Sequence, residues 1–128
     1  MPVHLDTDFL IHSLGAAGPE RRRLHQIATT GQVIEISAIA WYEFSRGPRT
    51  PEQLATARSF FGEDGIVSFS ERLASVAAEV FRQLGSPRRR AADIAIGVTA
   101  TSRDATLMSL NANDFAGIPG LRVEGAGS

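Results

Sequence analysis

The sequence predicts an α/β fold with three layers, in which a central, mainly parallel sheet is flanked by helices. Short apolar segments of strand character alternate with longer segments of helical spacing, which is the pattern of repeated β–α–β units. The chain has 128 residues, 43% of them hydrophobic, and this is sufficient for one core. We therefore expect a single domain over 1–128, with its core in 3–123 and a frayed tail in 124–128.

Turn residues and helix caps divide the first half of the chain. Pro19 suits the first turn of a helix that ends at Gly31, and Ser37 suits the N-cap of the next helix. Thr50 and Gln53 have the spacing of a capping box. The expected elements are a strand over 3–5, a helix that includes 9–11, a helix over 20–30, a strand over 32–36, and helices over 38–46 and 51–61.

The second half contains the clearest helical pattern in the sequence. Between Ser70 and Gly85 the apolar residues recur at helical spacing, which predicts an amphipathic helix packed on the core. A further helix over 91–102 is rich in small residues and suits close burial against a sheet. Strands are expected over 66–69, 105–110 and 121–123.

Composition excludes several classes of protein. The net charge is -1, so no overall positive field attracts nucleic acid, although all 13 basic residues are Arg. Because there is no Lys, a signalling receiver domain, which needs one on a late strand, is disfavoured. The absence of Cys excludes disulfides and Cys-based zinc sites. With no transmembrane-length apolar run and no signal-peptide pattern, we expect a cytoplasmic protein without membrane contact.

Two acids, Asp6 and Asp8, directly follow the first predicted strand. In open α/β sheets ligands bind at the carboxyl ends of the strands, so these acids stand where a ligand site would form. The alternative is structural, because Asp is a favoured N-cap residue and its charge suits the helix dipole. The pair alone does not decide between a ligand site and a helix cap.

Three further acids occur close to later strands or in the helices that follow them: Glu43, Asp93 and Asp114. Glu43 could instead pair with Arg46 one helical turn on. Asp93 could serve the helix dipole, and Asp114 could start a turn. In a parallel sheet, however, these acids would meet at one edge, where carboxylates repel and raise each other's pKa. A cation is the natural complement, and oxygen ligands without Cys or a nearby His favour Mg²⁺ or Mn²⁺ over Zn²⁺.

Four segments carry a resemblance to a known family: 5–11, 37–43, 92–95 and 109–115. In order and spacing they resemble the motifs of PIN domains, and the chain looks most like the VapC-type ribonuclease toxins of bacterial toxin–antitoxin pairs. The similarity extends from Val3 to Val123. It implies a PIN-like fold and a Mg²⁺-dependent ribonuclease, for which Mn²⁺ can substitute, with one or two metal ions.

The resemblance also implies roles for individual residues. Asp6, Glu43 and Asp93 match the family's acids, and Asp6 and Asp93 match its usual metal ligands. Asp114 is expected to complete the catalytic set on grounds of charge, with Asn111 as the alternative.

Two positions depart from the family pattern. Asp8 stands where Asn is common, and Ser109 stands where Thr is frequent. Together with Asn111, these two residues are expected to support the site.

Partners follow from the resemblance in the same way. It implies an RNA substrate, a homodimer, and a small VapB-type antitoxin whose inserted side chain blocks the acidic pocket. Arg88, Arg89 and Arg90 adjoin Asp93 and could contact RNA phosphates, although an exposed basic loop is an equal interpretation. The alternative function is a non-catalytic PIN-like module that binds RNA or protein, but such a module would be expected to have lost the acids retained here.

Overall fold

The computed structural model describes residues 1–15 and 18–125, and its centre is a five-stranded sheet. The strands are β1 (Val3–Leu5), β2 (Ile34–Ser37), β3 (Ile66–Val67), β4 (Thr106–Met108) and β5 (Arg122–Glu124). They lie in the order β3-β2-β1-β4-β5, and every neighbouring pair is parallel. The predicted α/β class with a central parallel sheet is confirmed.

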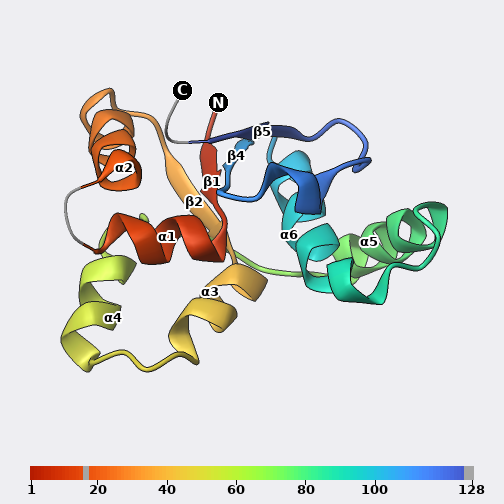
Figure 1. Cartoon of the computed structure of the whole chain (residues 1–128), viewed down its shortest axis with the longest axis horizontal. Coiled ribbons are helices and arrows are strands. Elements are labelled where there is room, and N and C mark those ends of the chain that lie inside the picture. The colour runs from red at the N-terminus through yellow and green to blue at the C-terminus, as the bar shows by residue number, and fades with distance from the viewer. Residues whose placement is uncertain (16–17, 126–128) are drawn as a thin grey trace.

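Helices cover the sheet on both sides. They are α1 (Thr7–Ser13), α2 (Pro19–Thr29), α3 (Ala38–Ser45), α4 (Pro51–Arg58), α5 (Glu71–Gln83) and α6 (Ala91–Ser102), with short 3-10 turns η1 (Arg88–Arg90) and η2 (Ala112–Phe115). In Figure 1, α1, α2 and α4 gather on one side of the strands, and α5 and α6 lie on the other. Helix α6 contacts β2 and β4, and α5 packs on α6. No helix among the described residues combines the length and apolar character needed to cross a membrane.

Side-chain caps begin several of these helices where the sequence indicated. Ser37 Oγ accepts a hydrogen bond from Ile39 N at 3.1 Å, and Thr50 and Gln53 form the expected reciprocal capping box. Strand β1 has its expected bounds, whereas β2 and β4 are shorter than expected. Strand β3 is also shorter and has only two residues. It pairs with β2 only at Ile36 and Ser37, so its ladder closes after two residues instead of continuing to 69.

The last strand, β5, begins inside the segment expected to be a strand and extends into the expected tail. Glu124 is paired in register with Met108, and its carboxylate lies 3.3 Å from Arg23 Nη2. Glu124 is therefore held at the edge of the sheet. Residues 126–128 of the expected tail lie outside the described residues.

The middle of α6 is fully buried, as its small residues predicted. Residues 94–100 are all buried, and they face the sheet, α5 and the segment before β5. At Gly97 an added Cβ would stand 2.7 Å from Ile118 Cδ1 and 3.1 Å from Leu121 Cδ2. Only glycine permits this close approach without a shift. The packing fixes the position of α6, whose first turn carries Asp93.

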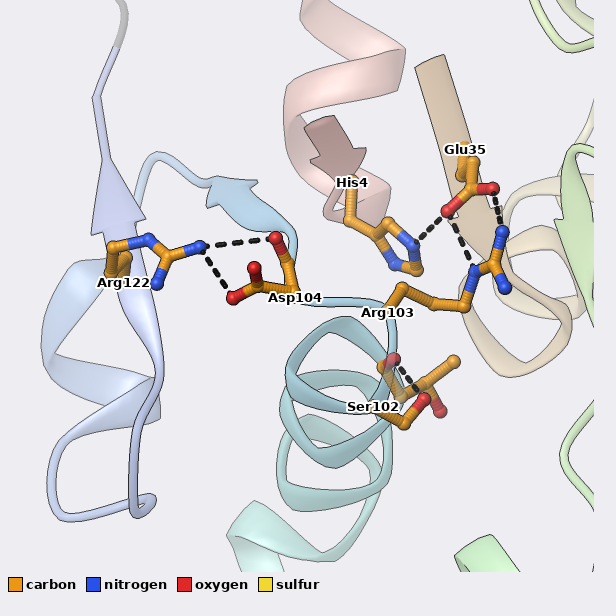
Figure 2. A network of polar contacts seen from close by, with 7 residues as sticks. His4, Glu35, Ser102, Arg103, Asp104 and Arg122 are labelled. Atoms are coloured by element: carbon orange, nitrogen blue, oxygen red, sulfur yellow. Dashed lines mark hydrogen bonds and ion pairs between the residues drawn. The ribbon is translucent and has the colours of Figure 1, made fainter. Parts of the chain in front are cut away.

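A buried ionic network joins β1, β2 and the C-terminal end of α6 (Figure 2). His4 and Glu35 are direct partners in neighbouring strands, and both are buried. His4 Nε2 lies 2.9 Å from Glu35 Oε1, while Arg103 Nε and Nη2 donate to Glu35 Oε1 and Oε2 at 3.2 and 2.7 Å. No pattern in the sequence had pointed to this network.

The network keeps Glu35 ionised, whereas burial keeps His4 neutral. Burial raises the pKa of Glu35, but the hydrogen bonds and positive charge of its partners outweigh burial and lower the pKa below the ordinary value. Burial lowers the pKa of His4, against the opposing effect of Glu35. The unfolded chain therefore binds more protons than the native one, so this contribution to stability is lost as the pH falls below 6.5 for His4 and below 4.5 for Glu35.

We expect Arg103→Ala to lower the free energy of unfolding by about 2–4 kcal/mol at pH 7, because it removes two hydrogen bonds from a buried carboxylate. Arg122→Ala is the matched control, since Arg122 pairs at 3.1 Å with Asp104, whose side chain is 78% exposed. An exposed pair of this kind contributes only about 0–1 kcal/mol. Urea unfolding of both variants measures the difference, and equal losses would contradict a stabilising role for the buried network.

Candidate active site

Asp6 lies where β1 ends and α1 begins, and its two carboxylate oxygens have different partners. Oδ1 accepts a hydrogen bond from Thr7 N at 2.8 Å, which makes Asp6 the N-cap of α1. Oδ2 accepts a hydrogen bond at 3.0 Å from Ser109 Oγ, just after β4. The cap interpretation is therefore confirmed. The same carboxylate also stands at the carboxyl ends of the two central strands, where a ligand would bind.

Glu43 reaches this edge from the side of α3. Its Oε1 accepts a hydrogen bond from Thr7 Oγ1 at 2.8 Å, so the first residue of α1 connects Glu43 to the end of β1. The alternative ion pair with Arg46 is not formed, and the Arg46 guanidinium instead lies 5.2 Å from the centroid of the Tyr42 ring. Sequence reasoning missed Thr7. The only available signal was a hydroxyl residue directly after Asp6, and nothing in the sequence places Glu43 opposite it.

Asp93 enters the site from the first turn of α6, and its pKa reports which acids surround it. The pKa of Asp93 is raised to about 6, mainly by burial and in addition by the negative charges of Asp6, Asp114 and Glu43, while Arg90 acts in the opposite direction. The other three predicted catalytic acids thus all lie within electrostatic reach of Asp93.

The pKa of Asp6 is raised to about 6 as well. Burial is the largest cause, and the charges of Asp8 and Glu43 add to it, whereas the hydrogen bonds from Thr7 and Ser109 lower the pKa. Both carboxyl groups are therefore raised first by burial and then by neighbouring negative charges, and these charges lack a full complement of positive ones.

The residues predicted to support the site form a chain of contacts beside Asp6. Ser109 Oγ, which donates to Asp6, accepts a hydrogen bond from Asn111 N at 3.0 Å. Asn111 Nδ2 in turn donates to Asp8 Oδ2 at 3.3 Å. Asn111 therefore contacts Asp8, whereas Asp114 projects from η2 as an exposed residue whose charge acts on Asp93.

The three consecutive arginines of η1 have different environments. Arg88 and Arg89 are exposed. Arg90 is half-buried, and its guanidinium donates to the main-chain carbonyl of Asp114 in η2, at 3.0 Å, and to that of Ala116 directly after η2. Arg90 thus joins the start of α6 to the turn that carries Asp114, and only Arg88 and Arg89 present free guanidinium groups to a ligand.

The acids suit a hydrated divalent cation better than an enclosed metal. Within residues 1–15 and 18–125, no group of three His, Asp or Glu side chains converges closely enough to hold a metal ion between them. Mg²⁺, however, is commonly bound through one or two carboxylates and keeps several of its water molecules. The raised pKa values of Asp6 and Asp93 indicate negative charge that such a cation would neutralise. The residues present fit Mg²⁺ in this way.

An apolar groove lies between the C-terminal end of α1, the connection from α3 to α4, and α4. It has a volume of about 400 Å³. Ile11, Leu14 and Phe44 supply apolar surface, and Arg49 and Glu52 supply charges of both signs. The four acids of the edge are not among the residues that line this groove.

Comparison with known proteins identifies a family and a set of similar structures. The PIN domain family model matches residues 3–121. VapBC2 from Rickettsia felis, solved bound to a promoter DNA fragment, is 22% identical over 98% of both chains, with a TM-score of 0.74. A toxin–antitoxin complex from Klebsiella pneumoniae is 25% identical over 93% of this chain and 94% of its own (TM-score 0.69), and FitAcB from Neisseria gonorrhoeae is 19% identical over 94% and 95% (TM-score 0.73). No curated protein matches significantly.

We expect Asp93→Asn, studied without metal, to be at least as stable as the parent at pH 7.5 and less dependent on pH. Because the pKa of Asp93 is about 6 in the folded chain and 3.8 in the unfolded one, the native state binds the proton more tightly. The contribution of Asp93 to the stability of the parent is present below pH 3.8 and is lost as the pH rises through 6. After allowance for solvent screening, the effect is on the order of 1 kcal/mol.

Urea unfolding in EDTA at pH 5 and pH 7.5 measures this difference. Glu71→Gln is the matched control, because Glu71 is also a first-turn acid but lies in α5, outside the acidic edge. A helix-dipole acid contributes about 0.3–1 kcal/mol, so the control should lose that amount. If Asp93→Asn loses as much as Glu71→Gln at pH 7.5, Asp93 is a structural acid of the same kind.

Proposed function

Because the chain belongs to the PIN domain family, we propose that it is a metal-dependent ribonuclease and the toxin of a VapBC-type toxin–antitoxin pair. The observation that carries the proposal is the convergence of acids around Asp93, on which the charges of Asp6, Asp114 and Glu43 all act. Asp6 and Asp93, which are 87 residues apart in the sequence, both have a pKa near 6 at one edge of the sheet. A purely structural pair of acids would gain nothing from this repulsion.

The acids divide the work of the proposed site. Asp6 and Asp93 would hold a Mg²⁺ ion, for which Mn²⁺ can substitute. When bound, the ion would supply a water molecule of lowered pKa and positive charge that stabilises the departing oxygen of the phosphodiester. Glu43 is fixed by Thr7 close to Asp6, where it would orient that water, and Asp114 would complete the acidic set from η2.

RNA would approach from the side of η1. Arg88 and Arg89 are exposed at the turn that leads into α6, next to the helix that carries Asp93. Arginine suits phosphate because its planar guanidinium donates two parallel hydrogen bonds. Contacts of this kind position an RNA strand without reading its sequence.

A small antitoxin is the proposed protein partner. Two of the similar structures are described as VapBC2 bound to promoter DNA and as a toxin–antitoxin complex, and an antitoxin is the partner that those descriptions imply. The groove between α1 and the α3–α4 connection offers this chain an apolar surface for such a partner. A homodimer belongs to the proposal as well, on the basis of the family resemblance.

The purified chain is expected to cleave single-stranded or looped RNA in Mg²⁺ or Mn²⁺, and EDTA should abolish the cleavage. Asp93→Asn should lose the activity, whereas the control Glu71→Gln should keep it. Mg²⁺ should also raise the melting temperature of the parent more than that of Asp93→Asn, because a ligand that binds only the native state stabilises it. Gel analysis of RNA ends and thermal melting measure both effects. Activity that survives exhaustive chelation would refute the metal mechanism, and RNA binding without cleavage would favour a non-catalytic binding module.

Arg88→Ala combined with Arg89→Ala should weaken RNA binding and flatten its dependence on salt. Each lost phosphate contact on a single strand reduces the slope of log K against log salt by about 0.7. Arg90→Ala is expected to behave differently, because it breaks the connection to η2 and should lower the melting temperature. Binding in EDTA at several salt concentrations tests this, and an unchanged slope in the double variant would mean that the exposed arginines do not contact RNA.

A further inference from the structure

The contacts of Thr7 give it a place in the site that no sequence motif assigned. Its backbone N donates to Asp6 Oδ1 and its hydroxyl donates to Glu43 Oε1, each at 2.8 Å. We infer that Thr7 is the positioning residue that fixes Glu43 beside Asp6 for metal binding. This inference rests on the proposed function, and it identifies Thr7 as the residue on which the position of Glu43 depends.

Glu43 needs a donor because its surroundings repel it. The charge of Glu43 raises the pKa of both Asp6 and Asp93, so its own carboxylate stands in their combined negative field. A glutamate side chain has several rotatable bonds and would turn toward solvent if nothing held it. Among the described residues, Thr7 Oγ1 is the one hydrogen-bond donor that the Glu43 carboxylate has.

Thr7 is itself rigidly placed. It is the first residue of α1, and its backbone N donates a hydrogen bond to the carboxylate of the N-cap residue Asp6. Its β-branched side chain also has few allowed rotamers. The hydroxyl lies 3.5 Å from the carbonyl oxygen of Ala40, in the turn of α3 that precedes Glu43. Thr7 thus fixes the distance between the start of α1 and the inner face of α3.

The bond to Thr7 occupies only one of the two oxygens of Glu43. The hydroxyl contacts Oε1, which leaves Oε2 for a metal ion or for a water bound to it. Residues that orient a ligating group in this way commonly contribute about 10- to 100-fold to metal affinity or activity. Loss of the hydroxyl should therefore weaken metal binding although Thr7 need not touch the metal.

Mn²⁺ binding to the full chain tests the inference, measured by titration calorimetry on the parent, Thr7→Val, Thr7→Ser and Glu43→Ala. Thr7→Val keeps the branched shape and removes the donor, so its dissociation constant should rise about 10- to 100-fold. Thr7→Ser retains the hydroxyl and should restore most of this loss. In a Glu43→Ala background, Thr7→Val should have no further effect, because the residue acts through Glu43.

Any of three calorimetric results would overturn the positioning role. Thr7→Val could bind Mn²⁺ as tightly as the parent, Thr7→Ser could lose as much affinity as Thr7→Val, or the effect of Thr7→Val could persist in the Glu43→Ala background. Urea unfolding in EDTA measures the tether independently of metal, and additive losses for Thr7→Val and Glu43→Ala would show that the hydrogen bond does not form. If instead the parent itself binds no Mn²⁺ and cleaves no RNA, both the proposed function and this inference are wrong. If the parent cleaves RNA but Thr7→Val binds Mn²⁺ as tightly as the parent, only the inference about Thr7 fails.

Discussion

Repulsion among carboxylates at one edge of a parallel sheet is the constraint on which the arrangement of this chain depends. Parallel strands bring their carboxyl ends together, and here Asp6 follows β1 while Asp93 begins the helix that covers the same sheet. Burial removes the water that would otherwise screen these charges, and it is the largest cause of the raised pKa of both acids. Folding must therefore overcome an unfavourable interaction that serves no purpose in the fold itself.

Neutral and basic residues around the edge hold Asp6, Glu43 and the turn that bears Asp114 in place against this repulsion. Thr7 donates to both Asp6 and Glu43, Ser109 donates to the second oxygen of Asp6, and Arg90 holds the turn that bears Asp114. These donors do not neutralise the acids, as the pKa of Asp6 near 6 shows. They fix the orientation of the carboxylates and leave their negative charge available, as expected of a site that binds a cation.

The sequence predicts those parts of the structure that depend on local pattern. Helical periodicity, caps such as Ser37 and the alternation of strands and helices lead to the α/β class, and the positions of the acids relative to strand ends lead to their meeting at one edge. Contacts between distant segments leave no such pattern. Glu35 was indistinguishable from any other acid in a strand, since its partner Arg103 lies 68 residues away. The role of Arg90 could not be predicted for the same reason. Nothing in the sequence distinguishes it from Arg88 and Arg89, because its partner Asp114 is 24 residues away.

The buried network, the close packing at Gly97 and the contacts of Arg90 hold α6 at its end, its middle and its start. A helix anchored at three points moves as one rigid body with the sheet. The backbone of Asp93 therefore cannot advance toward a ligand, and only its short side chain can turn. The turn η2 is tied to the same helix, because Arg90 donates to the carbonyls of Asp114 and Ala116 and Phe115 is buried. Asp93 and Asp114 are therefore carried by one connected unit, so their separation is set by the fold before any ligand arrives.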